Sequence, residues 1–136
     1  MDFLYQDPYP ILKDDTHYKK LTSDYVKVEQ LGDREILVVD PKGLELLAQE
    51  AMDDVSFMLR SAHLQKLRNI IEDPEATDND RFVAYNLLQN AAVAVEGQLP
   101  SCQDTGTAIV VAKKGENVYT GVDDGEWLSK GIYNTY

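Results

Sequence analysis

One short stretch of this 136-residue sequence gathers the residue types that do chemistry. Residues 99–107 are Leu-Pro-Ser-Cys-Gln-Asp-Thr-Gly-Thr, which brings the only cysteine together with an amide, a carboxylate and several hydroxyl groups. The stretch has no apolar period and lies between a helical pattern that stops at Gly97 and the apolar run 108–112. We therefore predict a loop between a helix and a strand, which is where binding groups tend to lie.

Cys102 admits three interpretations from the residues alone. A single cysteine is most often a small buried hydrophobe, and the alternatives are a thiolate nucleophile or a metal ligand. His17 and His63 are both distant in sequence, so only the fold could bring a base close to the thiol. The neighbouring negative charge of Asp104 disfavours a free thiolate, whereas bound iron would supply the positive charge that stabilises one.

Residues 102–107, followed by the apolar run and Lys113-Lys114-Gly115, closely resemble the signature of class I fumarate hydratases, the iron–sulfur hydro-lyases. Other segments resemble the beginning of the single-chain members of that family: 15–16, 21–26, 73–76, 79–84 and 131–136. The resemblance therefore covers essentially the whole chain. A linked set of segments is far more specific than any one of them.

The resemblance implies a 4Fe-4S cluster held by three cysteines, with one iron open to substrate and water. Cys102 matches the first of these ligands, and the other two would lie in sequence that this chain does not contain. Gln103 and Asp104 match residues that contact the dicarboxylate, and Asp104 also matches the proposed proton donor to the leaving hydroxyl. We therefore expect the N-terminal part of an enzyme that hydrates fumarate reversibly to L-malate, inactive and without a cluster on its own.

Two alternatives stay open at this point. The α-type region of a tartrate dehydratase has a related loop, although the similarity upstream of Asp40 favours the single-chain fumarate hydratases. A non-catalytic interaction module would keep the fold without the chemistry, and the intact run Cys102-Gln103-Asp104 argues against that decay. The family also implies a homodimer for the complete enzyme, with the remainder of the enzyme chain as the other expected partner.

Composition sets further limits on function. The formal net charge of −11 disfavours nucleic acid and anionic membranes as partners. One cysteine excludes an intramolecular disulfide. The first residues are not an apolar stretch with a cleavage site, so we expect no secretion, and no apolar run approaches the roughly 20 residues needed to span a bilayer. We therefore expect a cytoplasmic protein, and with 43% hydrophobic residues we expect it to bury a sizeable core.

The elements that would position the loop predict an α+β domain over residues 1–136, with three to four packed helices and short antiparallel strands. Residues 1–15 contain two prolines and no period, so we expect an extended arm. Two β-prone runs on either side of Gly32-Asp33 predict a hairpin. The apolar run 108–112 and residues 117–120 predict a second hairpin, with the apolar run inside a sheet.

Apolar residues three and four positions apart predict the helices. N-caps are expected at Asp40, at Ser61, within residues 77–80 and at Asp123 or Asp124. A left-handed cap at Gly97 should end the helix over residues 79–95. The residues of that helix expected to face inward are Phe82, Val83, Leu87, Leu88, Ala91 and Val95.

Overall fold

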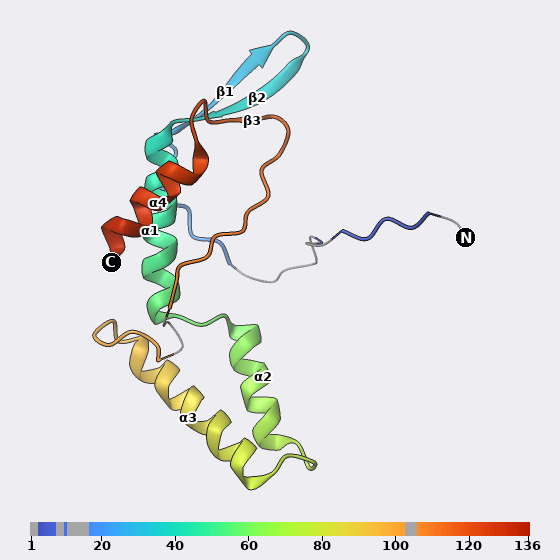
Figure 1. Ribbon diagram of the computed structural model, residues 1–136, viewed down its shortest axis with the longest axis vertical. Coiled ribbons are helices and arrows are strands. Elements are labelled where there is room, and N and C mark those ends of the chain that lie inside the picture. Colours follow the sequence, from blue (N-terminus) through green and yellow to red (C-terminus); the bar gives the residue numbers. More distant parts are fainter. Residues whose placement is uncertain (1–2, 8–9, 11–16, 103–105) are drawn as a thin grey trace.

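The structure is a computed structural model that describes residues 3–7, 10, 17–102 and 106–136. Its elements are β1 Val26–Leu31, β2 Arg34–Val39, α1 Pro41–Phe57, α2 Ser61–Glu72, α3 Asp78–Ala94, β3 Val118–Tyr119 and α4 Asp124–Thr135. Within the described residues these form four helices and one three-stranded sheet (Figure 1). The predicted α+β class is confirmed.

The first predicted hairpin is confirmed. β1 pairs antiparallel with β2 in a register that places Val26 opposite Val39 and Leu31 opposite Arg34. The connection is a two-residue turn, and Gly32 takes the positive φ of 65° that such a tight turn requires. β3 then pairs with the other edge of β2 in parallel, so the sheet is mixed.

The second predicted hairpin is wrong. Residues 108–112 form no strand, and the side chain of Ile109 is 81% exposed. The free edge of β2 is instead taken by the short strand β3, and the backbone N–H of Leu37 donates to the carbonyl of Asn117 at 2.8 Å. No described strand is left beside the apolar run, so residues 106–117 lead to β3 without regular secondary structure (Figure 1).

Local capping explains where three of the helices begin. The Asp40 carboxylate accepts from the backbone N–H of Lys42 at 2.9 Å at the start of α1. Thr77 forms a reciprocal capping box with Asp80 at the start of α3, and the Asp123 carboxylate caps α4. The expected cap at Ser61 is wrong by one residue, since Arg60 holds the N-cap position of α2 and makes no side-chain capping bond.

The elements pack as two units (Figure 1). The sheet unit consists of the three strands with α1 and α4, and the helical hairpin consists of α2 and α3. α4 crosses α1 in very close contact at Gly131, where an added Cβ would lie only 2.1 Å from the carbonyl oxygen of Glu45. In the helical hairpin, Leu67 of α2 and Ala84 of α3 are the buried apolar residues nearest the middle of the helices.

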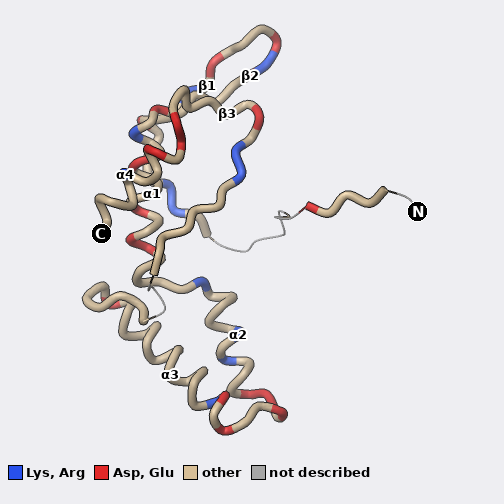
Figure 2. Tube along the Cα trace, viewed as in Figure 1, with Lys and Arg blue, Asp and Glu red and all other residues tan. Residues whose placement is uncertain are grey.

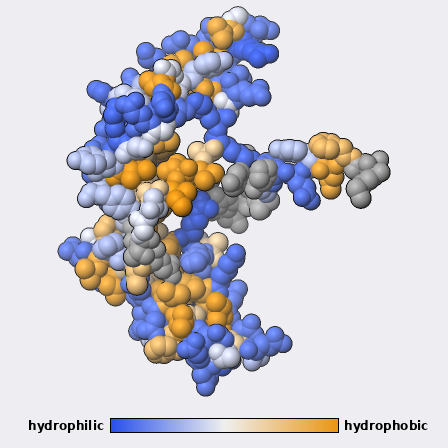
Figure 3. All heavy atoms as spheres, viewed as in Figure 1, coloured by the Kyte–Doolittle hydropathy of each residue, from blue (hydrophilic) through white to orange (hydrophobic). Residues whose placement is uncertain are grey.

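The sizeable core that the composition allows does not form among the described residues. Among the described residues only Ala48, Leu67, Ala84 and Ala94 are buried apolar side chains. The accessible surface is 11181 Å², whereas a compact protein of this mass exposes about 7,100 Å². The predicted inward face of α3 is also partly wrong, since Phe82 is 66% exposed and Val83 and Val95 are exposed as well. Two elongated units provide no third layer to cover that face, and Figure 3 shows apolar residues on the surface of both.

The predicted N-terminal arm lies largely outside the described residues. Residues 3–7 have no regular secondary structure and extend away from the two units in Figure 1. Phe3, Leu4 and Tyr5 are exposed. Asp7 forms an ion pair with Lys113, at 2.7 Å, that connects this segment to the rest of the described chain.

Candidate functional site

The end of α3 leads directly to Cys102. Ala94, the last residue of the helix, is almost completely buried, and Val95 forms the C-cap. Gly97 has a φ of 73°, which confirms the predicted left-handed glycine after the helix. After these exposed residues the chain is buried again at Ser101, which is only 4% exposed.

Three hydrogen bonds between described residues hold Ser101 and Cys102 in place. The backbone N–H of Ser101 donates to the carbonyl of Ser56 in α1 at 2.7 Å. The side-chain oxygen of Asn90 in α3 accepts from the backbone N–H of Cys102 at 2.9 Å and from the Ser101 hydroxyl at 3.3 Å. The turn is therefore attached to one helix of each unit, at the place where α1 and α3 come together (Figure 1).

Cys102 is an exposed free thiol. The interpretation as a buried hydrophobe is therefore wrong, and the interpretations that need an accessible sulfur remain. His63 is an exposed residue in the first turn of α2. Within the described part of the chain, no three His, Cys, Asp or Glu side chains come together as a possible metal site.

The donor set fits one ligand position of an iron–sulfur cluster and no more. Thiolates are the usual ligands of such clusters, and the exposed Cys102 can supply one. The sequence has no second cysteine. A cluster with three cysteine ligands thus needs two from outside this chain.

Gln103 and Asp104, the other predicted site residues, lie outside the described residues. Their assigned contacts with a dicarboxylate remain predictions. Sequence reasoning missed Asn90 and Ser56. Both residues are distant from Cys102 in the chain, and only the fold brings them into contact with its turn. The available signal was an asparagine directly before the apolar run 91–95 at the end of the α3 pattern.

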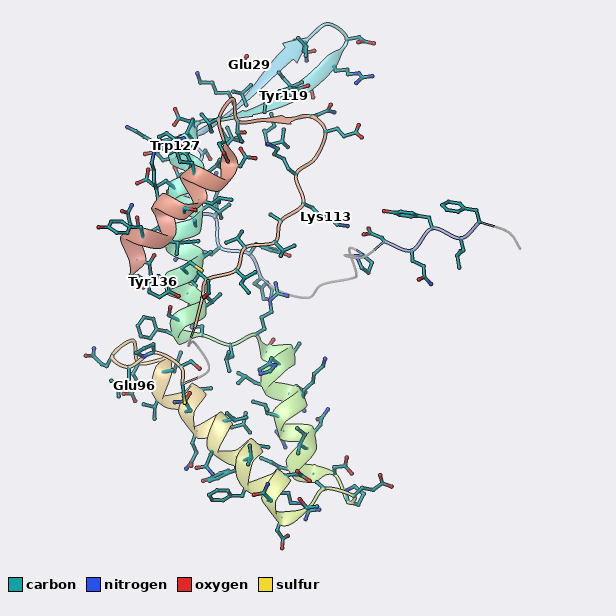
Figure 4. All side chains as sticks on the ribbon, viewed as in Figure 1. Glu29, Glu96, Lys113, Tyr119, Trp127 and Tyr136 are labelled. Atoms are coloured by element: carbon teal, nitrogen blue, oxygen red, sulfur yellow. The ribbon has the colours of Figure 1, made fainter. Side chains whose placement is uncertain are left out.

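Two lysines follow the Cys102 loop, and both are engaged by acidic side chains. Lys113, labelled in Figure 4, pairs with Asp7 at 2.7 Å. Lys114 binds the carboxylate of Asp124, which also accepts from the Thr120 hydroxyl. The hydrogen bond from Lys114, followed by that from Thr120, holds the pKa of Asp124 below its ordinary value. The contact of Lys114 ties the irregular segment to the start of α4, and that of Lys113 ties it to residue 7, so neither lysine is unpaired.

The described residues line three cavities of more than 500 Å³, and Cys102 lines none of the three; the most open of them, of about 610 Å³, lies between α4 and Glu45 of α1. Another, of about 560 Å³, lies in the sheet unit between α1, α4 and the irregular segment, and Leu44, Leu47 and Leu128 contribute to its lining. The third, of about 510 Å³, lies at the α2–α3 connection, which Figure 2 shows to be rich in acidic residues. The exposed thiol of Cys102 thus lies apart from these cavities.

Comparison with known proteins identifies the class of protein. Residues 45–136 match the family described as fumarate hydratase (fumerase). This chain belongs to the fumarate hydratase family, and the predicted resemblance to its class I members is confirmed.

Individual relatives make the relationship more precise. The chain is 55% identical over 134 residues to the anaerobic class I fumarate hydratase of Escherichia coli K12, which covers 98% of this chain and 24% of that protein. It is 53% identical to the aerobic class I enzyme of Salmonella typhimurium, over 98% of this chain and 23% of the relative. It is 50% identical to mitochondrial fumarate hydratase 1 of Leishmania major, over 90% of this chain and 23% of the relative. The chain thus spans about a quarter of the length of the curated relatives it matches.

Among the described residues, no helix is both long and apolar enough to cross a membrane.

Proposed function

We propose that this chain is the N-terminal region of a class I fumarate hydratase and that it contributes Cys102 as one of three cysteine ligands of a 4Fe-4S cluster. The complete enzyme would hydrate fumarate reversibly to L-malate. The observation that carries the proposal is the 55% identity over almost the whole chain, including the loop at Cys102. The exposed thiol, held by contacts from two helices, is consistent with that role.

This chain's part in the reaction would be to place three consecutive side chains. When bound, the cluster supplies an open iron that acts as a Lewis acid. Cys102 would hold the cluster, and Gln103 would contact a substrate carboxylate. Asp104 would contact the dicarboxylate and hold the proton that is passed to the leaving hydroxyl, which requires hydrogen-bond reach of that oxygen.

Charge indicates that the site needs groups from outside this chain. A net charge of −11 repels a dicarboxylate at long range. Lys113 and Lys114, the cations nearest the loop in sequence, are paired with Asp7 and Asp124. The cations that bind fumarate would therefore come from the remainder of the enzyme, and we expect this chain alone to be inactive.

Fumarate is the substrate that the comparisons favour over tartrate, since the relatives named above are all fumarate hydratases. The proposal includes a cytoplasmic location, because a reducing compartment keeps an exposed thiol free to bind iron. It also includes a homodimer as the complete enzyme. The large exposed apolar surface is compatible with further chain packing against both units.

The test is a chimera in which this chain replaces the matching 134 residues of the E. coli anaerobic enzyme. The chimera and this chain alone are reconstituted anaerobically with iron and sulfide, and iron content and fumarate hydration are measured. We expect a cluster and activity only in the chimera. Cys102→Ala should abolish both, whereas Asp104→Asn should keep the iron and lower kcat by about 10²- to 10⁴-fold.

Asp33→Asn is the matched control for the carboxylate change, because Asp33 lies in the exposed β1–β2 turn. It should leave iron content and kcat unchanged. Turnover of fumarate by this chain alone, or a Cys102→Ala chimera with full iron and activity, would contradict the proposal.

A further inference from the structure

We propose that Asn90 is a positioning residue for Cys102, an inference that rests on the proposed role of Cys102 as a cluster ligand. Asn90 lies in α3, four residues before the helix ends at Ala94. Its side-chain oxygen lies 2.9 Å from the backbone nitrogen of Cys102 and 3.3 Å from the Ser101 hydroxyl oxygen. One carboxamide thus binds the ligand residue and the residue before it.

The chemistry of the donors fixes the orientation of this side chain. The backbone N–H of Cys102 can only donate, so the Asn90 atom that faces it is the carbonyl oxygen, which has two lone pairs for two donors. An alanine at this position would support the helix at least as well as asparagine. The side chain at position 90 is therefore explained by its contact with the turn and not by helix formation.

A second contact attaches the same turn to the other unit, through α1. The Ser101 N–H donates to the carbonyl of Ser56, in the last turn of α1, at 2.7 Å. The backbone immediately before the Cys102 side chain is therefore bound to α1 through Ser101 and to α3 through Asn90. Metal ligands that are held by neighbouring hydrogen bonds keep their direction toward the metal. Without Asn90, the backbone N–H of Cys102 would lose its hydrogen bond to α3, while Ser101 would keep its bond to α1.

α3 offers a matched control for the argument. Asn86 lies one turn earlier in the same helix, and its amide donates to the Phe82 carbonyl of that helix at 2.7 Å. Asn86→Ala removes the same side chain without touching the Cys102 turn. Asn90→Asp, in contrast, keeps an acceptor oxygen at the position that Cys102 needs.

The first experiment uses this chain alone and measures amide hydrogen exchange by NMR. Asn90→Ala should accelerate exchange at the Cys102 amide by about fivefold or more, the factor that corresponds to one lost hydrogen bond. Asn90→Asp should stay close to wild type, as should Asn86→Ala. Circular dichroism should show unchanged helix content in all three variants. Unchanged exchange at Cys102 in Asn90→Ala would overturn the inference.

The second experiment introduces the same variants into the chimera described above and measures iron content and the electron paramagnetic resonance spectrum of the reduced cluster. Asn90→Ala should lower iron content and alter the spectrum, and Asn90→Asp should restore the iron. An active wild-type chimera whose Asn90→Ala variant is unchanged in iron content and spectrum would overturn the role of Asn90 alone. A wild-type chimera without a cluster would overturn the proposed function, and with it the ligand role on which this inference rests.

Discussion

The sheet unit and the helical hairpin are held together by different means. In the sheet unit, α4 approaches α1 so closely that the backbone of Glu45 and Gln49 occupies the space a side chain at position 131 would need. In the helical hairpin, the contact rests on a few buried side chains, chiefly Leu67 and Ala84. A capping box at Thr77 and Asp80 fixes the start of α3.

This difference determines what each unit tolerates. Close backbone contact is sensitive to any added atom, because backbone cannot move aside as a side chain can. Side-chain burial is sensitive to deletion, since a cavity remains where the side chain was. Cys102 is attached to one helix of each unit, so both kinds of damage should reach the thiol.

The largest expected effect is on the sheet unit. Gly131→Ala places a Cβ 2.1 Å from the Glu45 carbonyl oxygen and 2.8 Å from the Cβ of Ala48. We expect a loss of about 3 kcal/mol or more in the free energy of unfolding, measured by urea denaturation. Gly115→Ala is the control, because its Cβ would meet only Val118 at an ordinary 3.6 Å. Equal stability of the two variants would show that α1 and α4 do not cross as described.

The next effect tests the helical hairpin. Leu67 is its large buried apolar residue, and Leu67→Ala should cost about 2–3 kcal/mol. Ile70→Ala in the same helix should cost about 1 kcal/mol, because Ile70 is already partly exposed. Amide exchange should accelerate in α2 and α3 while α4 remains protected. Equal acceleration in α4 would mean that the two units unfold as one.

A smaller effect concerns the start of α3. The Thr77 hydroxyl accepts from the backbone N–H of Asp80 at 3.2 Å, and the Asp80 carboxylate accepts from the backbone N–H of Thr77 at 2.9 Å. Thr77→Ala should therefore destabilise the hairpin by about 1 kcal/mol. Thr77→Ser keeps the hydroxyl and should retain most of that stability. A thermal melt that moves equally for both variants would argue against the capping role.

Features set by neighbours in sequence could be predicted, because their partners lie within a few residues. The caps at Asp40 and Asp123, the turn at Gly32 and the helix end at Gly97 all follow from local backbone requirements. The helix side of the predicted loop at Cys102 is confirmed for the same reason, since α3 ends just before it.

Features that depend on distant partners could not be predicted. The sequence pattern at residues 108–112 fits a strand, but whether it pairs depends on which segment occupies the edge of β2, and β3 does so. The exposure of Phe82 depends on whether another layer covers α3. The contacts of Asn90 and Ser56 with the turn at Cys102 likewise required the fold itself.

The smallest expected effect is the loss of stability in acid. A different carboxylate is responsible for this loss in each of the two units. Hydrogen bonds from the Thr77 hydroxyl and then the Thr77 backbone lower the pKa of Asp80, in the hairpin. Hydrogen bonds from Lys114 and then Thr120 lower the pKa of Asp124, in the sheet unit. A carboxylate whose pKa is lowered by folding stabilises the folded state above its ordinary value of 3.8, and this contribution is lost as the pH falls through the lowered value.

We therefore expect both units to lose stability between about pH 5 and pH 2, with Asp80→Asn flattening this dependence in α3 and Asp124→Asn flattening it in α4. The measurement is amide exchange of each helix across that range at low and high salt. The effects should be small because solvent reaches both carboxylates, and added salt should weaken the ionic contact of Asp124 with Lys114 more than the largely hydroxyl contact of Asp80. If either substitution flattened the acid dependence of both helices equally, the two units would be coupled through the Cys102 turn more strongly than their separate contacts imply.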